Sequence, residues 1–131
     1  MSEADIKTLR AGYEAISRGD WDAAFPAIHP DFEVKTADRM ASQTYHGWDE
    51  ARRFFEELLE PFEDVVAEPE EFFDRGNQIV VFLRVRSRPR GSTAAMEIRI
   101  GHLWTMRDGK PFQLELFPER EMALEAVGLK E

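Results

Sequence analysis

Few residues in this chain could do chemistry, and the histidine in the stretch "IGHLWTMRDGKPFQLEL" is the strongest candidate. His102 lies in a run of apolar and small residues just ahead of an Arg-Asp-Gly-Lys turn. A neutral imidazole among apolar side chains can donate a hydrogen bond to a substrate oxygen or accept one, with a pKa tuned by its surroundings. It can equally be a core residue bonded to a backbone carbonyl or a helix. The sequence therefore makes His102 the candidate catalytic residue and leaves both interpretations open.

Other reactive patterns are missing from the sequence. His29 and His46 precede turns or helix starts, and no spacing of the H-E-x-x-H type suggests a metal site. The chain has no cysteine, and it shows no P-loop, no dinucleotide glycine fingerprint and no nucleophile elbow. We therefore expect neither a bound metal nor a cofactor.

Composition limits the partners. A chain of 131 residues has the length of one domain, which we place at residues 1–131. Its net charge of -9 and pI near 4.9 disfavour nucleic acid and anionic membranes as partners. The start "MSEADIK" lacks the apolar core of a signal peptide, and the apolar run "IVVFL" is too short to span a bilayer. These features predict a cytoplasmic protein that binds neither nucleic acid nor membrane.

Helical periodicity dominates the first half of the chain. An apolar stripe predicts a helix over 2–18 that ends at Gly19. Asp20 is a natural N-cap for a second, short helix, which Pro26 should kink or restart. After a polar connection, a third amphipathic helix is expected from about Trp48 to Phe62.

Strand patterns fill the rest of the chain. Residues 32–36 alternate apolar and polar side chains and predict a short strand with Thr36 on its apolar face. From about residue 65 the period changes to two, and three glycine-containing turns divide the segment into a four-stranded antiparallel meander. The tail "EREMALEAVGLK" predicts a short C-terminal helix. Helices first and hairpins later define an α+β domain in which a curved sheet packs one face on the helices.

The last hairpin can be aligned in two ways. A two-residue Asp-Gly loop would place His102 opposite Glu115 and suggest a histidine-carboxylate dyad. A three-residue Arg-Asp-Gly loop, with Gly109 in a left-handed bulge position, places His102 opposite Leu114 instead. The second register separates apolar from polar side chains, which favours it by several buried side chains at about 1.5–3 kcal/mol each. We therefore expect the three-residue loop, with Glu115 on the opposite face from His102.

The order and spacing of four stretches resemble a known family. The stretches are "YEAISRGDWDAAFPAIHPDFEV", "YHGWDEARRFFEEL", "FFDRGNQIVVFLRV" and "HLWTMRDGKPFQLELFPEREMALEAVGL", which together cover nearly the full length. They are similar to the SnoaL-like branch of the ketosteroid isomerase and nuclear transport factor two superfamily. The resemblance implies a cone-shaped fold, in which a curved mixed or antiparallel sheet wraps around the N-terminal helices and encloses an apolar pocket. It also implies a homodimer, which we expect to form through the outer face of the sheet.

The resemblance transfers few functional residues. The position of His102 is similar to the one that holds an acid facing the oxyanion in ketosteroid isomerases and a histidine in related polyketide cyclases. The essential aspartate of those cyclases and of limonene epoxide hydrolases falls on Leu116, which cannot transfer a proton. The isomerase base falls on Thr36, with Asp38 two residues on. The arginine and aspartate of the epoxide hydrolases fall on Val81 and Leu83, which differ from the family pattern.

Two functions remain open on this fold. The first is binding of a small hydrophobic or cyclic molecule, with cofactor-free proton transfer of the isomerase, cyclase, dehydratase or hydrolase type carried by His102. The second is a non-catalytic ligand-binding or dimerisation module. The candidate ligand-binding residues are Tyr13, Thr36, Trp48, Phe55, Trp104, Leu114 and Leu116. For Tyr13, a core tyrosine with its tip near water is the competing interpretation.

Overall fold

One curved sheet carries helices on both of its faces. The computed structural model describes residues 2–36 and 43–128. The helices are α1 (Ser2–Ser17), α2 (Trp21–Ala24), the 3₁₀ turn η1 (Phe25–Ala27), α3 (Gly47–Leu59) and α4 (Arg120–Ala126). The strands are β1 (Glu33–Thr36), β2 (Thr44–His46), β3 (Phe62–Arg75), β4 (Gln78–Pro89), β5 (Met96–Arg107) and β6 (Lys110–Phe117).

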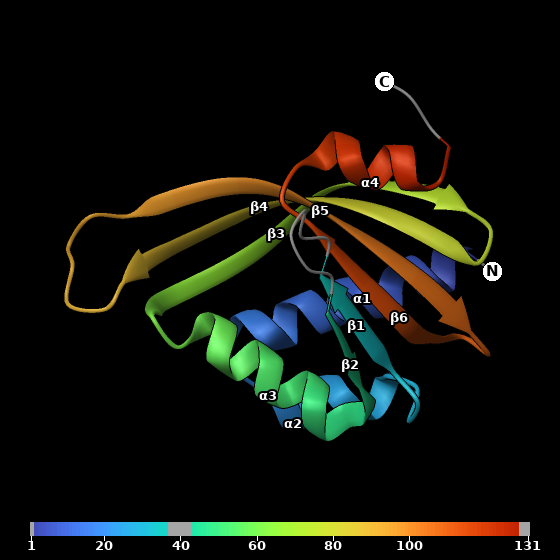
Figure 1. Cartoon of the computed structure of the whole chain (residues 1–131), viewed down its shortest axis with the longest axis horizontal. Coiled ribbons are helices and arrows are strands. Elements are labelled where there is room, and N and C mark those ends of the chain that lie inside the picture. The colour runs from blue at the N-terminus through green and yellow to red at the C-terminus, as the bar shows by residue number, and fades with distance from the viewer. Residues whose placement is uncertain (1, 37–42, 129–131) are drawn as a thin grey trace.

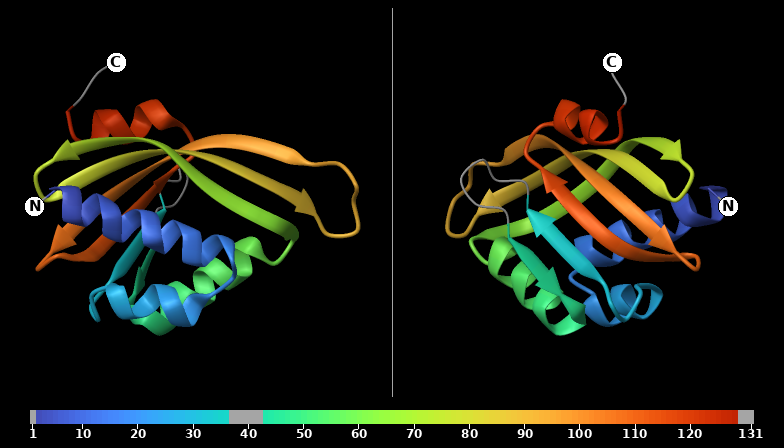
Figure 2. Two further views of the ribbon diagram at one scale, coloured as in Figure 1. Left: turned by 180° about the vertical axis from the view of Figure 1, so that it is seen from behind. Right: turned by 45° about the vertical axis from the view of Figure 1, so that its right-hand side comes forward.

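The sheet has the strand order β2-β1-β6-β5-β4-β3 and does not close into a barrel. β3 to β6 form the expected antiparallel meander, and β1 joins its end by pairing parallel to β6. Figures 1 and 2 show α1, α2 and α3 on the concave side of the sheet and α4 on the opposite side. The predicted α+β architecture, with a curved mixed sheet around N-terminal helices and a short C-terminal helix, is therefore confirmed.

The helix boundaries follow from local chemistry. α1 ends just before Gly19, whose φ of +72° is a conformation that residues with side chains rarely adopt. The side chain of Asp20 accepts a hydrogen bond from the backbone N–H of Ala23 at 3.1 Å, so the predicted N-cap of α2 is confirmed. Pro26 converts the continuation into a 3₁₀ turn, as expected.

Two differences concern the middle of the chain. α3 ends at Leu59 and not at Phe62, because Pro61 lies in the turn and Phe62 already pairs with β4. Part of the polar connection forms β2, which pairs with β1 and which the sequence did not predict. Asp38 belongs to residues 37–42, so the question of whether it reaches the pocket lies outside the described residues.

The expected register of the last hairpin is wrong. Asp108 and Gly109 both have positive φ, at 54° and 74°, and form a two-residue loop that pairs Arg107 with Lys110. A bulge then absorbs one residue near Phe112, so that His102 pairs with Leu116. The turn follows its own sequence preference, and the bulge restores the burial of the apolar face.

The bulge preserves one part of the prediction and changes another. Glu115 pairs with Leu103 and so lies on the opposite face from His102, as expected. Phe112 was expected on the inner face. Instead its ring packs edge-to-face against the His29 ring and lies beneath the Arg107 guanidinium. Pro111 takes its place on the inner side. His102 therefore does not form a dyad with Glu115.

A close contact behind β5 leads to a stability prediction. A Cβ atom at Gly101 would lie 2.8 Å from the Cβ of Ala123 and 3.2 Å from the Cα of Arg120, both in α4. Gly101→Ala is therefore expected to destabilise the protein by about 1–3 kcal/mol, because α4 must shift. Urea unfolding measures the change. Gly12→Ala in α1, where a Cβ meets nothing within 4 Å, is the control and should be neutral or stabilising. Equal effects of the two substitutions would contradict this packing.

Candidate functional site

A cavity of about 880 Å³ lies between the concave face of the sheet and the helices. Its wall comes from every helix and from all strands of the sheet except β2, and apolar side chains make up most of it. The exposed residues Leu58, Met96 and Ile98 also line it and mark an open, apolar end between α3 and β5. A cavity of this size and character is typical of small-molecule sites.

The structure brings most of the candidate residues to this cavity. His102 lines it, and so do Tyr13, Thr36, Phe55, Trp104, Leu114 and Leu116. Trp48 is the exception: it lies outside the cavity wall, and its indole N–H donates to the backbone carbonyl of His29 at 2.9 Å. Its side chain packs against Phe25 and is 38% exposed, so the structure does not bring Trp48 to the cavity wall with the other candidate residues.

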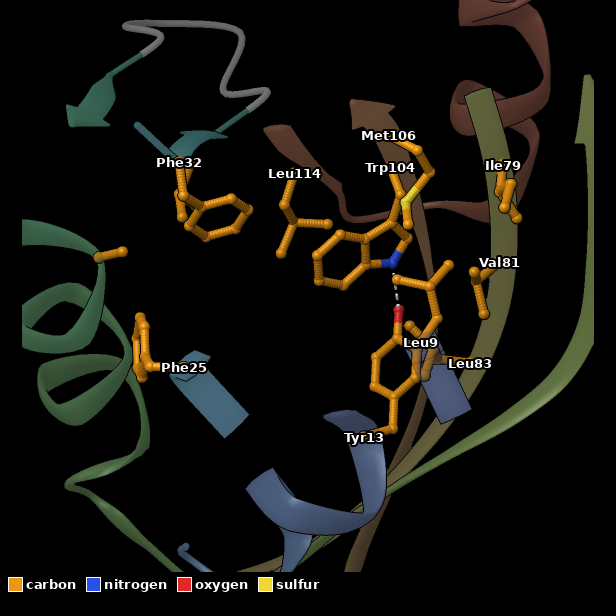
Figure 3. Close-up of a cluster of buried hydrophobic side chains, with 12 residues drawn as sticks. Leu9, Tyr13, Phe25, Phe32, Ile79, Val81, Leu83, Trp104, Met106 and Leu114 are labelled. Atoms are coloured by element: carbon orange, nitrogen blue, oxygen red, sulfur yellow. Dashed lines mark hydrogen bonds between the residues drawn. The ribbon is translucent and has the colours of Figure 1, made fainter. Parts of the chain in front are cut away.

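His102, Tyr13 and Trp104 form one hydrogen-bonded group in the wall. His102 and Trp104 are two residues apart on β5 and therefore project to the same face, while Tyr13 comes from the buried stripe of α1. The Tyr13 hydroxyl lies 2.7 Å from Nδ1 of His102 and accepts a hydrogen bond from Nε1 of Trp104 at 2.7 Å. Figure 3 shows the Tyr13 hydroxyl directed at the indole nitrogen of Trp104. Sequence spacing gave no sign of this contact, because 89 residues separate Tyr13 from His102.

Burial keeps this group uncharged. Desolvation lowers the pKa of His102 to about 3, because the imidazolium would lose its hydration inside the cavity wall. Desolvation also raises the pKa of Tyr13 far above its usual value, although the hydrogen bond from Trp104 acts in the opposite direction. At neutral pH the site therefore presents a neutral imidazole and a neutral phenol.

The wall offers little acid-base chemistry beyond this group. Among the described residues that line the cavity, Glu119 is the one carboxylate, and it is exposed beside the start of α4. Leu116 pairs with His102, so no acid faces the histidine from that strand. Thr36 lines the cavity while its hydroxyl oxygen accepts a hydrogen bond from the backbone N–H of Gln43. The described residues include no group of three or more potential ligands that could hold a metal ion.

The fold and cavity together define the class. A curved sheet that wraps α1, α2 and α3 and leaves an apolar cavity with buried polar groups is a cone-shaped α+β arrangement. The model of the SnoaL-like domain family matches residues 9–112, and the chain belongs to this family. No curated protein matches the chain. Within the described residues, no helix has the length and apolar character needed to cross a membrane.

Solved structures support the same fold. An NTF2-like protein of unknown function from Burkholderia pseudomallei is 23% identical, with a TM-score of 0.77 over 95% of this chain and 98% of the other. TerC, co-crystallized with polyporic acid, is 23% identical, with a TM-score of 0.78 over 95% and 97%. A putative polyketide cyclase from Sinorhizobium meliloti is 25% identical, with a TM-score of 0.68 over 84% and 93%.

Proposed function

We propose that this protein binds a small hydrophobic, cyclic organic molecule in the cavity. The observation that carries the proposal is an apolar cavity of about 880 Å³ whose wall contains one buried, hydrogen-bonded group of neutral polar side chains. Apolar walls supply affinity through desolvation, and a few fixed polar groups supply orientation. The family match and the polyporic acid co-crystallized with TerC support an organic ligand of this kind.

The catalytic form of the proposal rests on His102. With a pKa lowered to about 3, the neutral imidazole is a weak base at physiological pH and is better suited to polarising a ligand oxygen than to removing a proton. Isomerase-type or cyclase-type chemistry without a cofactor would use it in this way. The alternative is a binding module without turnover, which Leu116 in place of an acid favours. Both forms share the same cavity and the same ligand class.

Homodimerisation through the outer face of the sheet stays a prediction. That face carries arginines of β4 that pair within the chain, as Arg84 does with Glu68 at 2.6 Å. Arg84 also approaches Glu97 of β5 at 3.9 Å. A dimer contact would therefore meet charges that already have partners.

Indane, a bicyclic hydrocarbon, is the simplest probe of the proposal. We expect indane at a hundredfold excess over its Kd to stabilise the protein by about 2.7 kcal/mol, seen as a raised Tm. Fluorescence should also respond, since Trp21 and Trp104 line the cavity. Ile100→Trp should reduce the shift, because Ile100 lies in the cavity wall and the larger indole takes up part of the space.

The matched control is Arg99→Trp. Arg99 is adjacent on β5 but projects to the outer face, where it lies near Glu70 and Glu97. This variant should keep the full response to indane. If neither indane nor its bicyclic relatives 1-indanone and indole raise the Tm of the unmodified protein, or if indane stabilises Ile100→Trp as much as Arg99→Trp, the proposed function is refuted.

A further inference from the structure

The hydrogen bonds of His102, Tyr13 and Trp104 run in one direction. An indole N–H can only donate, so the Tyr13 oxygen is the acceptor in its bond with Trp104. The hydroxyl proton of Tyr13 then needs an acceptor of its own. Among the described residues, the one remaining partner of this hydroxyl is Nδ1 of His102, at 2.7 Å.

The direction of these hydrogen bonds determines which ring nitrogen of His102 carries the proton. If Nδ1 carried the proton, both neighbours of the Tyr13 oxygen would be donors, and the buried hydroxyl proton would have no acceptor. Buried donors without a partner are strongly disfavoured. Tyr13 therefore donates to an unprotonated Nδ1. Because the ring is neutral, the single ring proton of His102 is on Nε2.

Nε2 of His102 is the last donor in this series of hydrogen bonds and is the one that a ligand could contact. His102 lines the cavity, and no described residue forms a hydrogen bond with Nε2. Within residues 2–36 and 43–128, the fully buried side-chain atoms without a partner are Nε of Arg84 and Nε of Arg120. Nε2 of His102 is not one of them, and the cavity is the space that His102 borders.

We propose that Tyr13 is a positioning residue that fixes His102 as an Nε2–H donor, and that the cavity therefore selects ligands with a neutral acceptor oxygen at their buried end. Ketone, quinone and lactone carbonyls are acceptors of this kind, whereas a buried N–H of the ligand would meet another donor. This inference rests on the proposed function, since it assumes that a ligand enters the cavity. It assigns Tyr13 and Trp104 a part in specificity through the tautomer of His102, without contact between Tyr13 and the ligand oxygen.

The tautomer can be measured without any ligand. In protein labelled with ¹⁵N-histidine, we expect His102 to show an unprotonated Nδ1 and a protonated Nε2 between pH 5 and pH 8. Tyr13→Phe should allow both tautomers, because the donor to Nδ1 is lost. Tyr45→Phe is the matched control: its hydroxyl donates to Gln43 and lies outside the cavity wall, so the His102 signals should not change. A protonated Nδ1 in the unmodified protein would overturn the inference.

Ligand preference provides the second test. We would measure the Kd of three bicyclic probes of similar size: 1-indanone, which only accepts, indole, which only donates, and indane, which does neither. The unmodified protein should bind 1-indanone about 2- to 10-fold more tightly than indane, the value of one neutral hydrogen bond, and indole no more tightly than indane. Tyr13→Phe should reduce the ratio of indanone to indole affinity, and Tyr45→Phe should keep it.

The outcomes separate the two proposals. Binding of indane together with equal or tighter binding of indole than of 1-indanone overturns this inference and leaves the proposed function standing. Failure of all three probes to bind overturns both. Should Tyr13→Phe not fold, the tautomer and the order of the three probes in the unmodified protein decide the question by themselves.

Discussion

Replacing Phe32 by alanine is expected to lower the free energy of unfolding by about 3–5 kcal/mol. The Phe32 ring is 1% exposed and stacks on Trp104, with ring centroids 6.2 Å apart and an interplanar angle of 21°. Figure 3 shows it beside Leu114 and the indole. Truncation removes this contact and enlarges the existing cavity. Urea unfolding at neutral pH measures the loss, and near-UV circular dichroism reports on the environment of Trp104.

Phe112→Ala is the matched control for this substitution. Phe112 is half-buried at the bulge, where it contacts His29 and lies 3.8 Å from the Arg107 guanidinium, outside the cavity wall. The substitution is expected to lower the free energy of unfolding by about 1 kcal/mol, because Phe112 buries less apolar area than Phe32 does. Equal losses for the two alanine variants would show that Phe32 does not have the central packing role described above.

The second large effect is a pH dependence of stability that comes from His102. The pKa of His102 is about 3 in the folded protein and about 6.5 when unfolded, so the unfolded state binds the extra proton between these values. The stabilisation is fully present above about pH 6.5 and is lost as the pH falls toward 3. Between pH 7 and pH 5 this single group should cost about 2 kcal/mol.

His102→Gln isolates this contribution. The glutamine does not titrate, and its amide oxygen can still accept a hydrogen bond from Tyr13. We expect the difference in unfolding free energy between the unmodified protein and this variant to shrink by about 2 kcal/mol from pH 7 to pH 5. A difference that stays constant with pH would mean that His102 is solvated in the folded state.

Much of the fold could be predicted from the sequence because its signals are local. The stripe of α1, the Asp20 cap and the alternation in β3 to β6 each depend on residues that are neighbours in the chain. β2 and the parallel pairing of β1 with β6 were missed. β2 has three residues, too few to show a period, and the β1 and β6 partners are about 80 residues apart.

The last hairpin shows how two correct rules can compete. The rule that a hairpin separates apolar from polar residues is obeyed, and so is the preference of Asp-Gly for a two-residue loop. Treated as alternatives, they gave a wrong register for His102. The bulge near Phe112 reconciles them, and bulges leave little trace in a single sequence.

The sequence predicts which residues face the candidate site but not the hydrogen bonds between them. Alternation along β5 places His102 and Trp104 on the apolar face, and helical periodicity places Tyr13 on the inner side of α1. The hydrogen bonds between them depend on distances across the fold, which periodicity does not contain. Trp48 shows the limit of periodicity for a single residue. The pattern places it on the apolar face of α3, but it lies at the start of the helix, where its indole N–H donates to the His29 carbonyl.

The parallel pairing of β1 with β6 also sets an order of events during synthesis. Residues 33–36 can find their partners only after residues 113–116 have left the ribosome, and Tyr13 must likewise wait for His102. Contacts this distant in sequence are slow to form, because a long loop must close first. α1 can pack against β3 as soon as residues 62–75 are made, but the part of the cavity wall that β6 forms, and the pairing of β1, are added last.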